Sequence, residues 1–440
     1  MKFFKFPPFI PAALFCLPAL PGVIPAAQAQ RFEYEEPPHN YYSTPLTDAG
    51  SELDSDFTSQ KFELPAGGDL AAVKAVLARL KIKESSQILV FSKTSVQRDR
   101  IRPENPRAIY FNDECYAAWV PGGLMEIASV DPAMGPIFYI LDFHRADRAV
   151  PRMDRPQNCL DCHGAGMTNG VPGIMVRSVF PDRDGTPLYQ AGTALIDQTS
   201  PFETRWGGWY VTGQHGMARH RGNGIAVNEG RTVTLDVEKG ANLHSLDAFF
   251  ATKNYARGDS DIVALMVMEH QTGMTSRLVE AAYAMRGAIL RQAELRRELG
   301  DPPTEELVGT AKIIADSHAD KILQYLLFSG EAALPEGGIE GGADFQKDFR
   351  EGRPASPDGR ALTDFQLLTR LFKYRCSYLI YSRLWDNLPP KFLDLLYQRL
   401  HGILTAETPS PRFAHLSAGE RRDILQILRA TKPGLPANWK

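Results

Sequence analysis

The sequence contains little cysteine and shows no excess of charge of one sign. Its 440 residues include 5 cysteines, and 49 Lys and Arg nearly balance 52 Asp and Glu, giving a formal net charge of −3. Because binding to nucleic acid or to an anionic membrane relies on a basic surface, this balance favours neither partner. Three cysteines (Cys16, Cys115 and Cys376) stand alone, so the chain also lacks the second cysteine pair that a zinc site of similar spacing would use.

The chain also has no long hydrophobic run that is free of proline. Its most apolar stretch lies in residues 1–29, which begin with Lys2 and Lys5, contain repeated prolines and end in Ala27-Gln28-Ala29. A basic start, an apolar middle and a small-residue end are typical of a secretory signal peptide, whereas the prolines interrupt the helix that a membrane anchor would need. We therefore predict a signal peptide at residues 1–29, cleavage before Gln30, and no transmembrane anchor afterwards.

One short stretch combines residue types and spacing that dictate a chemistry. In Cys159-Leu160-Asp161-Cys162-His163, two thiols three positions apart can add to the vinyl groups of a haem, and the histidine after the second thiol can then bind the iron. The sequence predicts one covalent haem c held by Cys159 and Cys162, with His163 as an axial ligand. A redox dithiol and half of a zinc site are the alternatives.

Export and haem attachment support one another. Haem is joined to such thiols outside the cytoplasm, so we expect a periplasmic location in a Gram-negative bacterium and help from haem-insertion machinery. After signal cleavage, Cys115 and Cys376 remain beside the haem pair. They could form a disulfide in an oxidising compartment, but their apolar surroundings in the sequence favour two free buried thiols.

The pattern along the chain predicts an α+β protein and not the small all-α cytochrome c fold. We expect four parts: the signal peptide, an extended arm at 30–68, a β-rich haem-attachment domain at 69–258, and a helical domain at 259–440 with a Gly- and Pro-rich loop at 330–360. A short helix should follow Asp69 as its capping residue. Strands are expected at 88–91, 108–111, 116–120 and 137–141, forming an antiparallel meander, and again near 174–180 and 209–212. Helices are expected at 261–299, from Pro302 to about 328, at 362–385, at 390–404, and after a capping box at 417–420.

The second axial position on the iron decides between an electron carrier and an enzyme. His270 is the leading candidate, because helical spacing places it on an apolar face with Met266, Val267 and Met274, where an imidazole needs a partner. The alternative is a core histidine bonded to a carbonyl group or to Glu269.

Weaker candidates lie outside the long predicted helix. His215 and His220 follow a Gly- and Trp-containing stretch whose glycines would let a flat ring system approach the backbone. Arg177, Arg205 and Arg219 could pair with haem propionates, since a guanidinium group suits carboxylates, but ordinary salt bridges would explain them equally well. A surface loop is the alternative for both histidines.

Beyond the motif, the chain resembles a family of exported, single-haem cytochrome c-type proteins of Gram-negative bacteria. The resemblance spans nearly all of the chain after the signal peptide and implies a haem-binding, electron-transfer role for Cys159, Cys162 and His163; it implies no substrate. The matching segments are Val90-Phe91-Ser92-Lys93-Thr94-Ser95, Arg107-Ala108-Ile109-Tyr110-Phe111-Asn112, Gly170-Val171-Pro172-Gly173, Arg177-Ser178-Val179-Phe180-Pro181, Trp206 to Gly213, Glu269-His270-Gln271-Thr272 and Thr431-Lys432-Pro433-Gly434-Leu435-Pro436.

These observations leave two haem-based hypotheses for function, beside a non-haem structural or binding protein that would use the Cys159 and Cys162 pair for zinc or a disulfide. The first is a periplasmic monohaem cytochrome that passes electrons between redox partner proteins. The second is a haem enzyme, peroxidase-like or another oxidoreductase, in which the helical half and the 330–360 loop enclose a pocket over an open iron position. The size of the chain motivates the second hypothesis, because a carrier does not need this much protein.

Overall fold

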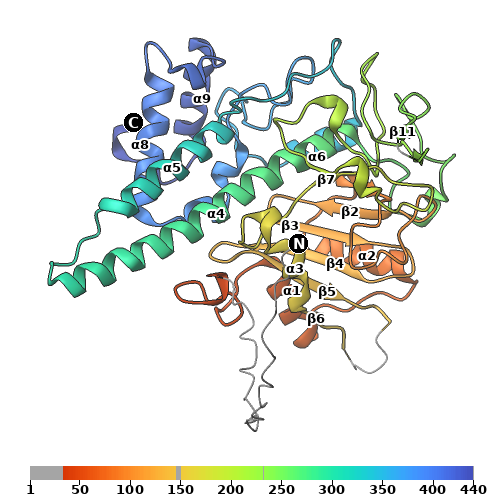
Figure 1. Ribbon diagram of the computed structural model, residues 1–440, viewed down its shortest axis with the longest axis horizontal. Helices are drawn as coiled ribbons and strands as arrows, with labels where there is room; N and C mark the ends of the chain where they lie inside the picture. The colour runs from red at the N-terminus through yellow and green to blue at the C-terminus, as the bar shows by residue number, and fades with distance from the viewer. Residues whose placement is uncertain (1–32, 145–149, 231, 440) are drawn as a thin grey trace, which may run out of the picture.

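The computed structural model describes residues 33–144, 150–230 and 232–439. The predicted signal peptide at residues 1–29 lies outside these ranges. No helix within them combines the length and apolar composition that crossing a membrane requires. A β-rich first half and a helical second half confirm the predicted α+β class, and the protein is not a small all-α fold (Figure 1).

A seven-stranded sheet forms the centre of the first half, in the order β6-β5-β4-β3-β2-β1-β9. Every neighbouring pair is antiparallel, which confirms the predicted meander, although the sequence reading omitted β4. The strands are β1 (Ile88–Val90), β2 (Arg107–Phe111), β3 (Cys115–Trp119), β4 (Met125–Asp131), β5 (Gly135–Leu141), β6 (Met153–Asp154) and β9 (Trp209–Tyr210). Two smaller sheets pair β7 (Arg177–Ser178) with β8 (Ala194–Leu195) and β10 (Ala226–Asn228) with β11 (Val233–Leu235).

The register of the sheet places the haem motif and the longest helix on the same face. Tyr116, Ala128 and Phe138 are direct cross-strand partners, so their side chains share a face. On this face the Tyr116 hydroxyl accepts a hydrogen bond from Gln271 of α4 (Ile262–Leu299), and Phe138 contacts the ring of His163. Helix α1 (Ala49–Thr58) lies on the opposite face, which Ser129 and Tyr139 occupy.

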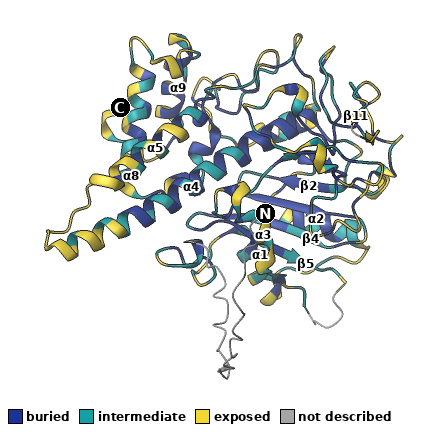
Figure 2. Cartoon of the chain, in the orientation of Figure 1, coloured by how far each residue is buried: buried dark blue, intermediate teal, exposed yellow. Residues whose placement is uncertain are grey.

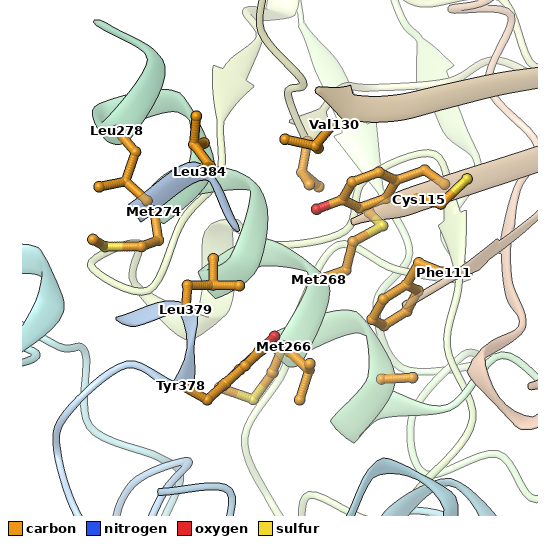
Figure 3. Close-up of a cluster of buried hydrophobic side chains, with 14 of the residues drawn as sticks. Phe111, Cys115, Val130, Met266, Met268, Met274, Leu278, Tyr378, Leu379 and Leu384 are labelled. Carbon is orange, nitrogen blue, oxygen red and sulfur yellow. The ribbon is translucent and has the colours of Figure 1, made fainter. Parts of the chain in front are cut away.

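Helix α4 confirms the predicted helix at 261–299 and packs between the two halves. Asp261 caps it by accepting a hydrogen bond from the Ala264 amide at 2.9 Å, and Gly300 ends it in the left-handed conformation. Figure 2 shows it buried along the sheet and exposed at its far end. Figure 3 shows Met268 of α4 near Phe111 of the sheet, Met266 near Tyr378, and Met274 near Leu278 and Leu384.

The remaining helices confirm some predicted elements and correct others. The C-terminal helices are α5 (Gly309–Leu326), α8 (Pro390–Thr405) and α9 (Ala418–Thr431). Helix α5 therefore begins later than the predicted Pro302. Ser417 caps α9 as predicted, but the carboxylate of Glu420 binds Arg375 and so does not complete a capping box. Asp69 is the first residue of α2 (Asp69–Arg79) and not its cap, which is Gly68.

The predicted helix at 362–385 is wrong for most of its length. Only the short α7 (Arg383–Asp386) and a 3-10 turn at Tyr378–Tyr381 are helical there. Phe365 and Phe372 instead form an isolated antiparallel bridge, and their stacked rings pack against Phe349. The apolar spacing in this segment thus serves an aromatic cluster and not the face of a helix, which is a tertiary override of local preference.

Two further expectations need correction. The predicted extended arm at 30–68 contains α1, which Asp48 caps through its carboxylate and which buries Leu53 and Phe57. The predicted loop at 330–360 contains α6 (Ala343–Arg350), anchored by buried Phe345 and Phe349. In addition, buried apolar residues from both the 69–258 and 259–440 segments form one continuous core.

Candidate functional site

The predicted haem-attachment motif, Cys159–His163, occupies a single helical turn at the edge of the sheet. The chain leaves edge strand β6, passes through a 3-10 turn at Gln157–Cys159 and enters α3 (Leu160–His163). Residues three and four apart share a helix face, so Cys159, Cys162 and His163 lie on one side of this turn. Leu160 faces the core and is 3% exposed. The turn therefore presents two thiols and an imidazole together.

Both motif cysteines are free thiols. Cys162 is exposed and Cys159 is partly buried. Burial, reinforced by the carboxylates of Glu126 and Asp161, raises the pKa of Cys159 to about 11, so this thiol is protonated at neutral pH. In the described part of the chain, no three His, Cys, Asp or Glu side chains gather closely enough to hold a metal ion by themselves.

One hydrogen bond fixes the orientation of His163. Its Nδ1 lies 2.9 Å from the carbonyl oxygen of Gly173, and because a carbonyl only accepts, Nδ1 carries the proton. Nε2 therefore carries the lone pair, and none of the described residues forms a hydrogen bond with it. Burial lowers the pKa of His163, which favours the neutral ring. A metal-binding histidine typically holds a backbone carbonyl in this way.

The loop that supplies this carbonyl is fastened at both ends. The Gly173 amide donates to the carbonyl oxygen of His163 at 2.8 Å, closing the loop. Ser276 of α4 donates to the carbonyl oxygen of the next residue, Ile174, at 3.2 Å, and Asn169 donates to Glu280 at 3.1 Å. The donor set, its orientation and its support therefore fit a covalently attached haem with His163 as an axial ligand. The sequence reading gave Gly173 no role, because spacing alone does not reveal which carbonyl meets the ring.

His270 lies in the core with both ring nitrogens engaged. Nδ1 donates to the amide oxygen of Gln198 at 2.6 Å, and Nε2 accepts from the hydroxyl of Ser377 at 2.7 Å. The ring is fully buried and stacks on Phe328 with centroids 4.5 Å apart. Neither nitrogen is available to iron in this arrangement. The geometry matches the core alternative, although the partners are an amide and a hydroxyl and not a carbonyl group of the backbone or Glu269.

His215 and His220 contact each other, with ring centroids 4.6 Å apart, but within the described ranges no hydrogen bond or ring contact joins either ring to the motif turn. His215 donates from Nδ1 to the carbonyl of Ala218 and accepts at Nε2 from the amide of Asn242. Nδ1 of His220 accepts from the amide of Gly222, while its Nε2 is buried without a partner. The structure thus brings these two candidates together with one another and not with the predicted haem.

The three candidate propionate partners occupy different settings. Arg205 is 2% exposed and forms an ion pair with Glu269 at 2.5 Å, so it is committed inside the core. Arg219 pairs with Glu238 at 2.8 Å. Arg177 donates to Thr193 at 3.3 Å. Among the described residues no hydrogen bond or ion pair links any of them to the motif, and the salt-bridge alternative describes Arg205 and Arg219.

The 330–360 segment, considered above as a cover over the iron, lines a different cleft. This cleft of about 560 Å³ is bounded by α6, α1 and the start of β3, and its lining includes Asp113, Gln271 and Arg353. Cys159, Cys162 and His163 do not line it. In the second hypothesis the 330–360 segment therefore lines a cleft away from the motif residues.

The sequence reading missed the segment at 33–44, which packs against the motif turn. A Cβ atom added at Gly164 would lie 3.0 Å from the Tyr34 ring, so the segment and the residue directly after His163 are in close contact. His39 from the same segment is 1% exposed, and burial lowers its pKa to about 4. Tyr34, Tyr41 and Tyr42 lie close together in the sequence, and such a group of aromatic residues indicates burial. Because the segment shows no helical or strand periodicity, the sequence reading predicted an extended arm instead.

Comparisons with protein-family models, with curated proteins and with solved structures found no match.

Proposed function

We propose that this protein is a periplasmic c-type cytochrome that binds one covalent haem and transfers electrons between redox partner proteins. The observation that best supports the proposal is the hydrogen bond from His163 Nδ1 to Gly173, which leaves Nε2 available on the same turn as two free thiols. When bound, the haem supplies one-electron oxidation and reduction at its iron.

Each motif residue has a distinct task in this proposal. Cys159 and Cys162 anchor the macrocycle through thioether bonds, and the exposure of Cys162 gives haem-insertion machinery access to the turn. His163 binds the iron, and Gly173 holds the imidazole in one tautomer and one orientation. A position at the protein surface suits exchange of electrons with a protein partner.

The test is to produce the chain with its amino-terminal segment in a Gram-negative host that expresses haem-insertion machinery. We expect the purified protein to carry a haem-sized mass adduct and a reversible oxidised and reduced absorption spectrum. Replacement of Cys159 and Cys162 by Ser should abolish both. Cys115→Ser is the matched control, because this thiol is buried away from the motif turn, and should leave them unchanged.

His163→Ala separates attachment from ligation. The thioether bonds do not involve the imidazole, so the adduct should persist while the spectrum changes. A wild-type protein with no adduct in the presence of working machinery would overturn the proposed function.

A further inference from the structure

We propose that His39 is the second axial ligand of the iron, on the face opposite His163. The inference rests on the proposed attachment of haem at Cys159 and Cys162. His39 lies within residues 30–68, which the sequence pattern predicted to be an extended arm.

The first observation is that His39 is buried without a hydrogen bond. Within the described ranges four histidines are buried: His39, His215, His220 and His270. His215 and His270 use both ring nitrogens and His220 uses one, whereas neither Nδ1 nor Nε2 of His39 has a partner. A buried imidazole in this state has lost its hydrogen bonds to water and has gained none from the protein. Such a group is expected to bind a partner outside the polypeptide chain.

The second observation is the position of the segment that carries His39. Tyr34 lies against Gly164, the residue that follows His163, so closely that a Cβ there would come within 3.0 Å of its ring. The Tyr41 amide donates to the carbonyl oxygen of Tyr34 at 3.0 Å. This hydrogen bond closes a turn, and His39 is one of the residues of that turn. A macrocycle attached to Cys159 and Cys162 must lie against the residues around the motif turn, and this segment is among them.

The third observation is that one face of α4 supports both elements. Ser276 and Glu280 hold the loop that follows His163, through Ile174 and Asn169. Tyr283, one turn further along the helix, stacks on His39 with ring centroids 4.3 Å apart. Positions 276, 280 and 283 share a helix face, so the His163 loop and His39 lie along the same side of α4.

These observations together favour His39 over the other three buried histidines. His270 would have to give up two hydrogen bonds to bind iron. His220 also has an unpartnered nitrogen, but its ring packs against Phe202, Trp206 and His215, none of which touches the motif turn.

The test compares ferric and ferrous spectra of the haem-loaded wild type with those of His39→Ala, His39→Met and His220→Ala. Two imidazole ligands should make the wild type low-spin. His39→Ala should become high-spin in the ferric state, and added imidazole should restore the low-spin spectrum. His39→Met should remain low-spin with a higher reduction potential, because a thioether ligand favours the reduced iron. His220→Ala is the matched control for loss of a buried imidazole and should behave as wild type.

The outcomes separate this inference from the proposed function. A low-spin spectrum in His39→Ala, or a wild type that is high-spin, overturns the role of His39 while leaving haem attachment intact. Absence of a haem adduct in the wild type overturns the proposed function itself. If His39→Ala does not fold, the raised potential of His39→Met decides, since a purely structural histidine would leave the potential unchanged.

Discussion

His163 and Gly173 are joined by two hydrogen bonds, one from the imidazole Nδ1 to the carbonyl oxygen at 2.9 Å and one from the Gly173 amide to the His163 carbonyl at 2.8 Å. The second bond brings the backbone of Gly173 to the ring, and the first sets the plane of the imidazole. The nine residues between them therefore act as a closed loop that orients the proposed iron ligand.

The first prediction concerns this loop. A Cβ added at Gly173 would lie 2.9 Å from Thr168 Cγ2, so Gly173→Ala must shift either the Thr168 side chain or the backbone that carries the carbonyl. We expect it to reduce the free energy of unfolding by about 1–3 kcal/mol. In the haem-loaded protein a weaker bond to Nδ1 makes the imidazole a poorer electron donor, so the reduction potential should rise.

The matched control for that variant is Gly166→Ala in the same loop. A Cβ at Gly166 meets no atom within 4 Å, so we expect a change in unfolding free energy within about 0.5 kcal/mol and an unchanged potential. Chemical denaturation and redox titration measure the two quantities. Equal effects of the two substitutions would contradict the proposed role of Gly173.

The second prediction contrasts two arginines that the sequence offered as propionate partners. Arg205→Ala leaves Glu269 buried and unpaired, so it should reduce the free energy of unfolding by about 3–5 kcal/mol. Arg219→Ala removes an ion pair whose Glu238 side chain is 68% exposed, so its cost should stay below about 1 kcal/mol. Haem content per folded molecule should be unchanged in both variants. Loss of haem from folded Arg219→Ala would reinstate the propionate assignment.

The sequence predicted those elements whose pattern is local. Helix α4 has a capping Asp261 and a terminal Gly300, and four of the central strands are bounded by turn residues, so their positions could be read directly. The segment at 362–377 was misjudged because its aromatic residues are spaced for contact with Phe349, a partner supplied by α6. Such a partner cannot be seen in a local window.

The Cys159–His163 motif could be found in the sequence for the same reason, since it consists of adjacent residues, and its attachment to haem stays a prediction. The environment of each remaining histidine depends on distant ones. His270 was placed on an apolar helix face correctly, yet its partners Gln198 and Ser377 are 72 and 107 residues away. His39 was passed over because its burial arises from contact with Tyr283 of α4, which no pattern around residue 39 indicates.

The third prediction is a pH dependence of stability that originates at His270. Burial lowers the pKa of His270 from 6.5 to about 3. Between these values the unfolded chain binds a proton that the folded protein does not, so the folded protein loses up to about 1.4 kcal/mol of stability for each unit by which the pH falls. This contribution is fully present above pH 6.5 and is lost on acidification.

The measurement is urea unfolding of wild type and His270→Gln at several pH values. Glutamine does not titrate, so the stability difference between the two proteins should narrow as the pH falls below 6.5. Comparing the two is necessary because burial raises the pKa of Glu269 to about 7, which opposes the trend by favouring the folded protein at low pH. Parallel pH profiles would show that His270 is not buried in its neutral form.

The fourth prediction concerns the thiols of the chain from residue 30 onward. Cys162 is exposed, Cys159 is partly buried, and Cys115 and Cys376 are buried free thiols whose pKa values burial raises well above the usual range. Without haem, an alkylating reagent should modify Cys162 first and Cys159 more slowly under native conditions. All four thiols should react after denaturation.

In the haem-loaded protein the two motif thiols are consumed as thioethers, so only Cys115 and Cys376 should react, and only after denaturation. Mass spectrometry of the alkylated peptides gives the count. If Cys115 and Cys376 react only after a reductant is added, they form the disulfide that the sequence left open.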